Sequence, residues 1–398
     1  MSGTSLLRVL RQLRDPLLLG AVPITFGLLL VFAAYGPSWP TGFDFRGTLW
    51  EPARALLDGN PIYPPPTEDA VVVGNPAVYP PLFILASVPL ALVPVGTAAW
   101  LWFVALAFGV GVSLWILGVR DWRCYVLAVT SPVVVHGLFF GNLTVLLVLP
   151  LALAWRYRDR ARVAGLAVGV AVAAKLFVAP LVVWLLLTRR FRAAAWAVGS
   201  AAALVLGAWA LVGFEGLRDY PTLLRVVQDV YAVRSISVST VAGVLGASVP
   251  TAVAIAAVAG LGCLAVAAWL APRRDGDRRA FAVVVAACIV ASPIVWPNYA
   301  ALLFVPIAVT WPTVAPAWFF GYAVWFLGAL APKPTAQDVC CRPAGVPGQA
   351  WGWSHSEPAI WYPAAVMLIV AAVAGTVALA RARTRTQPID TRVLAMRS

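Results

Sequence analysis

Residues 81–119 read PLFILASVPLALVPVGTAAWLWFVALAFGVGVSLWILGV and contain no charged side chain. About 20 apolar residues are enough for one helix to cross a bilayer, so this run is longer than a single span requires. Arg120 and Arg123 end it, and it contains Pro89, Pro94 and Gly96. We therefore predict a membrane-spanning segment whose first part is broken near these three residues.

The whole chain has the composition of an integral membrane protein. Its 398 residues are 62% hydrophobic and 11% charged, with a mean hydropathy of +0.87, which is far too apolar for a soluble domain. The net charge of +13 does not indicate nucleic acid, because Arg gathers in the cytoplasmic loops of membrane proteins and no nucleic-acid motif accompanies it. We expect one all-α, polytopic membrane domain over residues 1–398.

Nine apolar segments alternate with polar loops, and three of them are long enough, or suitably broken, to form a pair of short spans. This pattern predicts about twelve transmembrane helices, the first of them retained rather than cleaved as a signal peptide. The segments are 17–35, 81–119, 124–155, 163–188, 193–214, 239–271, a helix pair and a further span within 280–331, and 359–380.

Most Lys and Arg residues fall in alternate loops, as the positive-inside rule requires. This distribution predicts that both termini are cytoplasmic, including the tail 381–398. The loops 36–80, 215–238 and 332–358 are then extracytoplasmic. The first of them contains a short helix from Pro52 to Asp58 that suits the membrane surface.

The best candidate for chemistry is Asp44, in the stretch Phe43-Asp44-Phe45-Arg46 that opens the first outer loop. A carboxylate at the edge of a bilayer can serve as a catalytic base. The alternative is that Asp44 caps the helix that follows. Arg46 either contacts a phosphate or pairs with Glu51.

Lys175 lies between the two halves of segment 163–188 and is one of only two lysines in the chain. An ionisable residue within a span usually marks function, although a lysine can also extend to the interface. A cation at this depth and a carboxylate in an outer loop suit a sugar linked to a lipid phosphate. Asp44 would accept the proton of the acceptor hydroxyl, and Lys175 and Arg46 would bind the donor phosphate, which leaves without a general acid.

The sequence resembles glycosyltransferase family 87, the polyprenyl-phosphate-mannose-dependent mannosyltransferases, in a series of ordered short motifs that cover most of the chain. The motifs are Asp44-Phe45, Ala55-Leu-Leu-Asp-Gly-Asn-Pro61 with Tyr63, Tyr79-Pro-Pro-Leu-Phe-Ile-Leu with Pro89 and Pro94, Gly141-Asn142, Gly165 to Lys175 with Pro180, and Ser292-Pro293 with Trp296.

This resemblance implies the C-type glycosyltransferase fold, a polyprenyl-phosphate sugar donor, a glycolipid or glycan acceptor of the cell envelope, and a catalytic Asp that maps onto Asp44. Substrate-binding positions expected on the same basis are Tyr79, His136, Asn142, Trp296 and Asn298. The chain has Pro297-Asn298-Tyr299 where many members carry His after the Ser-Pro-x-x-Trp motif. Mannosyl transfer is expected, and arabinofuranosyl transfer from a polyprenyl-phosphate donor remains an alternative.

We expect no cofactor and no zinc site, since the sequence has only two His and neither a CxxC nor an HExxH motif. A Mg or Mn ion that bridges Asp44 and a donor phosphate is the alternative, although a single carboxylate provides few ligands for it. Cys340 and Cys341 are adjacent in an outer loop, whereas the other cysteines lie in apolar segments. A transporter or flippase of lipid-linked sugars is the main rival hypothesis, because it would use the same interfacial charges. A purely structural scaffold is a third.

Overall fold

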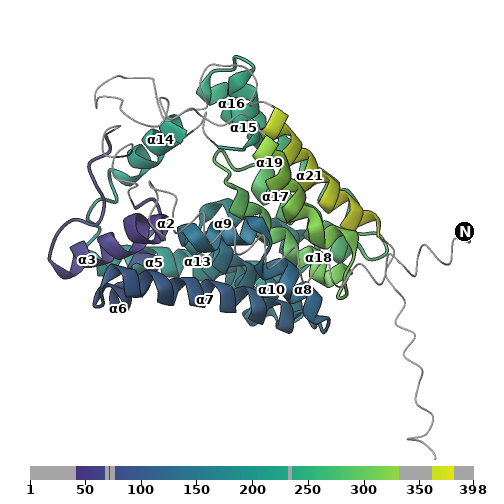
Figure 1. Cartoon of the computed structure of the whole chain (residues 1–398), viewed down its shortest axis with the longest axis horizontal. Helices are drawn as coiled ribbons and strands as arrows, with labels where there is room; N and C mark the ends of the chain where they lie inside the picture. Colours follow the sequence, from purple (N-terminus) through teal and green to yellow (C-terminus); the bar gives the residue numbers. More distant parts are fainter. Residues whose placement is uncertain (1–41, 68–70, 72–76, 232–234, 331–360, 381–398) are drawn as a thin grey trace, which may run out of the picture.

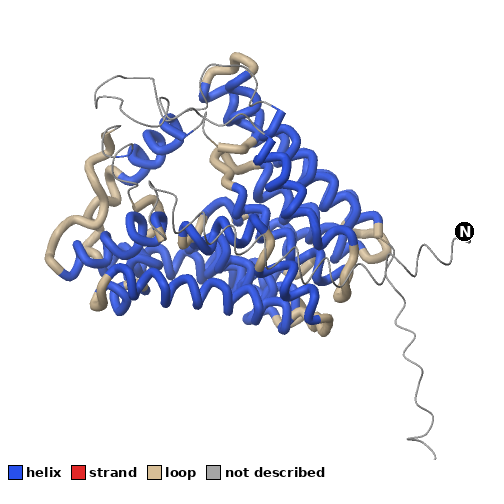
Figure 2. Tube along the Cα trace, in the orientation of Figure 1, coloured by secondary structure: helices blue, strands red, loops and turns tan. Residues whose placement is uncertain are grey.

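The computed structural model describes residues 42–67, 71, 77–231, 235–330 and 361–380 (Figure 1). All regular structure in these ranges is helical (Figure 2). The predicted span at 17–35, the predicted cytoplasmic tail at 381–398 and the whole loop at 332–358 lie outside the described residues, together with Cys340 and Cys341.

The described part of loop 36–80, which is predicted to be extracytoplasmic and is called the first outer loop here, begins with a continuous helical segment that contains Asp44. It consists of α2 (Phe43–Phe45), the π-helical turn η1 (Arg46–Trp50) and α3 (Glu51–Leu57). Pro52 lies at the start of α3 and Asp58 is its C-cap, so the short helix predicted here is confirmed. Gly42 precedes α2 with φ 79°, and a Cβ on it would lie 2.9 Å from the Cβ of Ala99. Only glycine suits this position.

The charge-free run 81–119 forms α5 (Pro81–Ala86), α6 (Val88–Ala91) and α7 (Val95–Ile116). Both interruptions lie beside Pro89 and Pro94, as predicted, because proline cannot donate the backbone hydrogen bond that would continue a helix. The break expected at Gly96 is not formed, since this residue lies in the first turn of α7. The Ser87 hydroxyl donates to the carbonyl of Phe83 at the first break. Only α7 is long enough to cross a membrane by itself.

Two of the three predicted helix pairs, 124–155 and 163–188, are divided at polar positions. Segment 124–155 forms α8 (Trp122–Val129) and α9 (Pro132–Phe140), bent by 54°, then η2 (Leu143–Leu147) and α10 (Val148–Arg156). Segment 163–188 forms α11 (Ala161–Ala174), η3 (Leu176–Val178) and α12 (Pro180–Leu187). The breaks fall at Gly141-Asn142 and at Lys175, the polar positions of each segment.

The remaining part of the chain adds two differences from expectation. Segment 239–271, predicted as one span, divides into two helices at the turn containing Gly246, which has φ 95°. Helix α14 (Tyr220–Tyr231) lies in the predicted outer loop 215–238. The helices from α13 onward otherwise lie in or overlap the predicted apolar segments. In order they are α13 (Phe191–Leu211), α14 (Tyr220–Tyr231), α15 (Val238–Val244), α16 (Val249–Leu270), α17 (Gly276–Val290), η4 (Pro297–Leu303), α18 (Phe304–Thr310), η5 (Pro316–Phe319), α19 (Phe320–Leu330) and α21 (Trp361–Leu379).

Four helices of the described ranges, α7, α13, α16 and α21, are long and apolar enough to cross a membrane, and the bent pair α8 and α9 is a possible fifth. The apolar segments 143–156, 161–174, 176–187 and 297–310 are shorter helices. This helical, multiply spanning architecture agrees with a membrane protein. Fewer than the predicted twelve helices of the described ranges are long enough to cross a membrane. The reason is that several predicted spans consist of shorter helical segments that meet at polar breaks.

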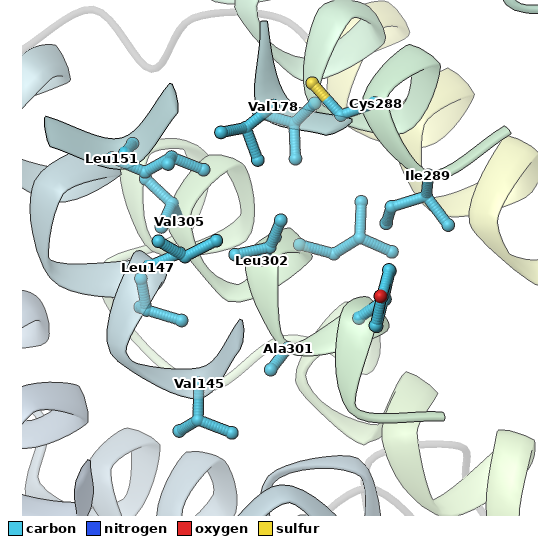
Figure 3. Close-up of a cluster of buried hydrophobic side chains, with 14 of the residues drawn as sticks. Val145, Leu147, Leu151, Val178, Cys288, Ile289, Ala301, Leu302 and Val305 are labelled. Atoms are coloured by element: carbon cyan, nitrogen blue, oxygen red, sulfur yellow. The ribbon is translucent and has the colours of Figure 1, made fainter. Parts of the chain in front are cut away.

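The helical segments that adjoin the breaks at Gly141-Asn142 and Lys175 pack into a buried apolar core. Every residue of α17 from Ala280 to Val290 is buried, and α17 packs against α12, α16 and α21 (Figure 1). Figure 3 shows apolar side chains from four parts of the chain meeting in this core. They are Val145, Leu147 and Leu151 of η2 and α10, Val178 of η3, Cys288 and Ile289 of α17, and Ala301, Leu302 and Val305 of η4 and α18.

Three of the predicted cytoplasmic loops meet at Asp277, in the first turn of α17. Its carboxylate accepts hydrogen bonds from Arg158 at 2.9 Å, from Arg190 at 2.8 and 2.9 Å, and from the indole of Trp184 at 3.0 Å. Arg158 and Arg190 flank opposite ends of the segment that contains α11 and α12. Since α11 rises about 21 Å over its 14 residues, this cluster lies far from Lys175 at the other end of that helix.

Candidate active site

The polar residues singled out in the sequence surround one cavity of about 560 Å³. Its walls come from the first outer loop, the end of α9, the break before η3, helix α14 and the turn before η4. The lining residues are Phe43, Asp44, Thr48, Val78, Tyr79, Pro80, His136, Phe140, Asn142, Lys175, Leu176, Tyr220, Leu224, Val227, Gln228, Pro293, Ile294, Trp296 and Tyr299.

Asp44 lies in the first turn of α2, and Gly42 occupies the N-cap position. The alternative role of Asp44 as a helix cap is therefore wrong. Its carboxylate Oδ2 accepts a hydrogen bond of 2.6 Å from Nδ2 of Asn142. The backbone carbonyl of Asp44 accepts a second bond, from the Thr48 hydroxyl at 2.5 Å. The side chain is thus held at the cavity wall by a residue 98 positions away.

Asn142 is itself oriented by the helix that follows it. It is the N-cap of η2, and its Oδ1 accepts from the backbone N–H of Thr144 at 3.0 Å. With Oδ1 occupied by this donor, Nδ2 is the atom that reaches Asp44. Gly141, with φ 69°, precedes it, and a Cβ there would lie 2.6 Å from the Cβ of Phe45. Glycine therefore permits the close approach of the two loops.

The ammonium group of Lys175 lies in the same cavity and is bound on several sides. Nζ donates to Oγ1 of Thr144 at 2.8 Å. It also lies 4.3 Å from the ring centre of Tyr299, 5.2 Å from that of Tyr79 and 5.7 Å from that of Phe177. Aromatic faces stabilise a cation electrostatically. Lys175 is the only Lys or Arg among the described residues that line the cavity.

The structure does not bring Arg46 into the cavity. Its exposed side chain donates to Glu51 at 2.7 Å, the pairing alternative considered above for this residue. Arg54 likewise pairs with Asp58 at 3.1 Å. Both pairs are close to half-exposed, so each contributes little to stability. Among the two residues predicted to bind phosphate, only Lys175 lines the cavity.

Four of the five predicted substrate-binding residues line the cavity, namely Tyr79, His136, Asn142 and Trp296. Asn298 does not, since it is fully buried behind the wall, where it packs against Gly137. Burial, with a further contribution from the Asp44 carboxylate, raises the pKa of Tyr79 well above its ordinary value. Tyr79 therefore presents a neutral phenol. The Tyr63 hydroxyl donates to the backbone carbonyl of Tyr79 at 2.7 Å.

Sequence reasoning missed several residues of the site. Thr144 does not line the cavity, but it contacts both Asn142 and Lys175. A threonine at the start of an apolar helix carries no distinctive signal. Helix α14 contributes Tyr220, Leu224, Val227 and Gln228, and the 3.6-residue spacing of its apolar side chains was the available indication. The Tyr220 hydroxyl donates to the carbonyl of Val78 at 2.9 Å and fixes this helix to the first outer loop.

The cavity combines a carboxylate, a cation and apolar lining residues. This combination suits the transfer of a sugar from an anionic lipid-linked donor. Within the described ranges, no three His, Cys, Asp or Glu side chains are placed to hold a metal ion.

Comparison with known proteins identifies a family of glycosyltransferases. The model of glycosyltransferase family 87 matches residues 77–297. A curated relative from Mycobacterium tuberculosis (strain CDC 1551 / Oshkosh), a polyprenol-phosphate-mannose-dependent alpha-(1-2)-phosphatidylinositol pentamannoside mannosyltransferase, is 28% identical over 350 residues, which cover 81% of this chain and 73% of the relative. No solved structure matches significantly. Since the family match spans more than half of the chain, the protein belongs to glycosyltransferase family 87.

Proposed function

We propose that the protein is an inverting glycosyltransferase that moves mannose from a polyprenyl-phosphate donor to a glycolipid or glycan acceptor of the cell envelope. Membership of glycosyltransferase family 87 supports the reaction class. The printed activity of the mycobacterial relative supports the polyprenyl-phosphate donor and the mannose. The charge pattern of the loops supports a cell-membrane location, cytoplasmic termini and an active site on the outer side.

The observation that carries the proposal is that the Asp44 carboxylate and the Lys175 ammonium line one cavity and are linked through Asn142 and Thr144. In the proposed step, an acceptor hydroxyl attacks the anomeric carbon of the donor sugar while Asp44 takes the hydroxyl proton. The bond between that carbon and the phosphate oxygen breaks, and the configuration inverts. The leaving polyprenyl phosphate gains one negative charge, which Lys175 stabilises.

One carboxylate is sufficient for this reaction, because Asp44 acts only as the base and Lys175 stabilises the leaving phosphate. A phosphate leaves without protonation, so the second carboxyl group that a glycosidase uses as general acid is not needed. The neutral phenol of Tyr79 adds no negative charge beside the phosphate. The apolar face of α14 covers the cavity and reduces the access of water, which would otherwise compete with the acceptor hydroxyl.

Substitution of Asp44 by Asn tests the proposal. Reconstituted protein is incubated with labelled polyprenyl-phosphate mannose and phosphatidylinositol mannosides as acceptor probe, and labelled glycolipid is measured. We expect Asp44→Asn to lower turnover by about 10²- to 10⁴-fold, because the amide cannot accept the hydroxyl proton. Asp58→Asn, a change of an exposed carboxylate in the same loop, should retain normal turnover.

Three results would contradict parts of the proposal. Full transfer by a folded Asp44→Asn protein would exclude Asp44 as the base. Transfer from polyprenyl-phosphate arabinose, with none from the mannose donor, would correct the sugar. Translocation of the donor across vesicles without any glycosylated product would support the transporter hypothesis instead.

A further inference from the structure

A chain of four residues connects the two charged groups of the cavity. Asn142 donates to the Asp44 carboxylate at 2.6 Å, the Thr144 N–H donates to the Asn142 amide oxygen at 3.0 Å, and Lys175 donates to the Thr144 hydroxyl at 2.8 Å. The middle two members stand two positions apart at the start of η2. One short helical turn therefore contacts both the carboxylate and the ammonium.

The turn that carries Asn142 and Thr144 is rigidly held. Asn142 and Thr144 are themselves buried, and Val145 and Leu147 of the same turn lie in the core shown in Figure 3. On the side of the first outer loop, Trp102 donates to the carbonyl of Gly141 at 2.8 Å. Close-packed surroundings of this kind resist displacement by even a methylene group.

Asn142 and Thr144 each have one polar group that helix η2 does not use. The capping bond of Asn142 uses only its oxygen, and Ser or Asp provides an equivalent acceptor at an N-cap. The amide nitrogen is not required for the cap and is committed to Asp44. Thr144 requires only its backbone N–H for the helix, so its hydroxyl is available for Lys175.

We propose that Asn142 and Thr144 are positioning residues that set the separation between the base and the phosphate-binding cation. Asn142 directs the Asp44 carboxylate toward the acceptor hydroxyl, and Thr144 directs the Lys175 ammonium toward the donor phosphate. This inference rests on the proposed function. It assigns the two side chains to different kinetic steps, since Asn142 acts on turnover and Thr144 acts on use of the donor.

Asn142→Ser separates positioning from capping, because serine keeps the N-cap and is too short to reach Asp44. With polyprenyl-phosphate mannose as donor, we expect kcat to fall by about 10- to 100-fold, since misplacement of a catalytic group by about 1 Å has effects of this size. The donor KM should stay within about twofold. Asn60→Ser, at an exposed position of the first outer loop, is the matched control and should leave both constants unchanged.

A double-mutant cycle tests whether Asn142 acts through Asp44. In the Asp44→Asn background, Asn142→Ser should cause no further loss of turnover, because the carboxylate that it orients is gone. Equal losses in both backgrounds, or a normal kcat in a folded Asn142→Ser protein, would overturn the role of Asn142. Thermal unfolding of each variant in detergent identifies losses that come from the fold alone.

Thr144→Val removes the hydroxyl and keeps the shape and the backbone N–H. We expect the donor KM to rise about tenfold or more, as for loss of a hydrogen bond to a charged group, with kcat changed less. Thr144→Ser should restore the donor KM. Thr188→Val, which removes a hydroxyl bonded only to the backbone carbonyls of Trp184 and Leu185, is the control.

The outcomes distinguish this inference from the proposed function. No transfer by the unaltered protein with any donor tested would contradict the proposed function. Transfer that depends on Asp44 and Lys175, together with a Thr144→Val protein of normal donor KM or an additive Asn142→Ser effect, would overturn the positioning roles and leave the proposed function standing.

Discussion

At the residue scale, Lys175 is enclosed by one hydroxyl and three aromatic rings and is the cation that faces the cavity within the described part of the chain. We predict that Lys175→Met, which keeps the length and apolar stem of the side chain, lowers kcat/KM for the donor by about 10- to 100-fold, the scale of a lost charge-assisted contact. Donor-concentration series with labelled polyprenyl-phosphate mannose measure this. Arg54→Met, at an exposed ion pair of the first outer loop, should have no effect. Normal donor use by Lys175→Met would leave the ammonium a structural role only.

At the element scale, the position of Lys175 depends on how closely α11 packs against α13. A Cβ on Gly169 of α11 would collide with the Ser200 hydroxyl and lie 2.8 Å from the carbonyl of Ala197. We predict that Gly169→Ala destabilises the protein by about 1–3 kcal/mol through overpacking and also lowers transfer, since α11 ends directly before Lys175. Gly199→Ala, on α13 with open space around it, should be neutral or stabilising because alanine favours helix. Thermal unfolding compares the two variants, and equal stability would show that the helices can separate without cost.

At the scale of the whole molecule, the Asp277 cluster and the Asp44 cavity lie at opposite ends of α11 and α17. We predict that these ends are on opposite sides of the membrane. In a cysteine-free background, Cys introduced at Asn60 should react with an impermeant thiol reagent from outside the cell. Cys introduced at Arg274 should react with the same reagent only after the membrane is permeabilised. Both positions are exposed in the structure, so failure to react cannot be attributed to burial. Labelling of both from the same side would contradict the predicted topology.

The sequence by itself determined the features that depend on neighbouring residues. Hydropathy identified the membrane class, because burying about 20 apolar residues in lipid requires no knowledge of their partners. Proline and glycine marked the breaks around Ser87 and Gly141, since their effect on the backbone is local. Lys175 was conspicuous for the same reason, because it is a single charge within an apolar segment, and Asp44 marked the polar loop that follows the first apolar segment.

The tertiary structure alone decided which of these residues meet. Asn142 lies 98 positions from Asp44, and their hydrogen bond depends on the packing of separate helices. The same packing placed Asn298 behind the cavity wall and brought side chains of α14 to line the cavity. Side-chain direction at these positions is set by contacts between distant segments, which composition and periodicity do not report. The proposed base and cation, Asp44 and Lys175, were therefore readable from the chain, whereas the contacts of Asn142 and Thr144 that join them depend on the tertiary structure.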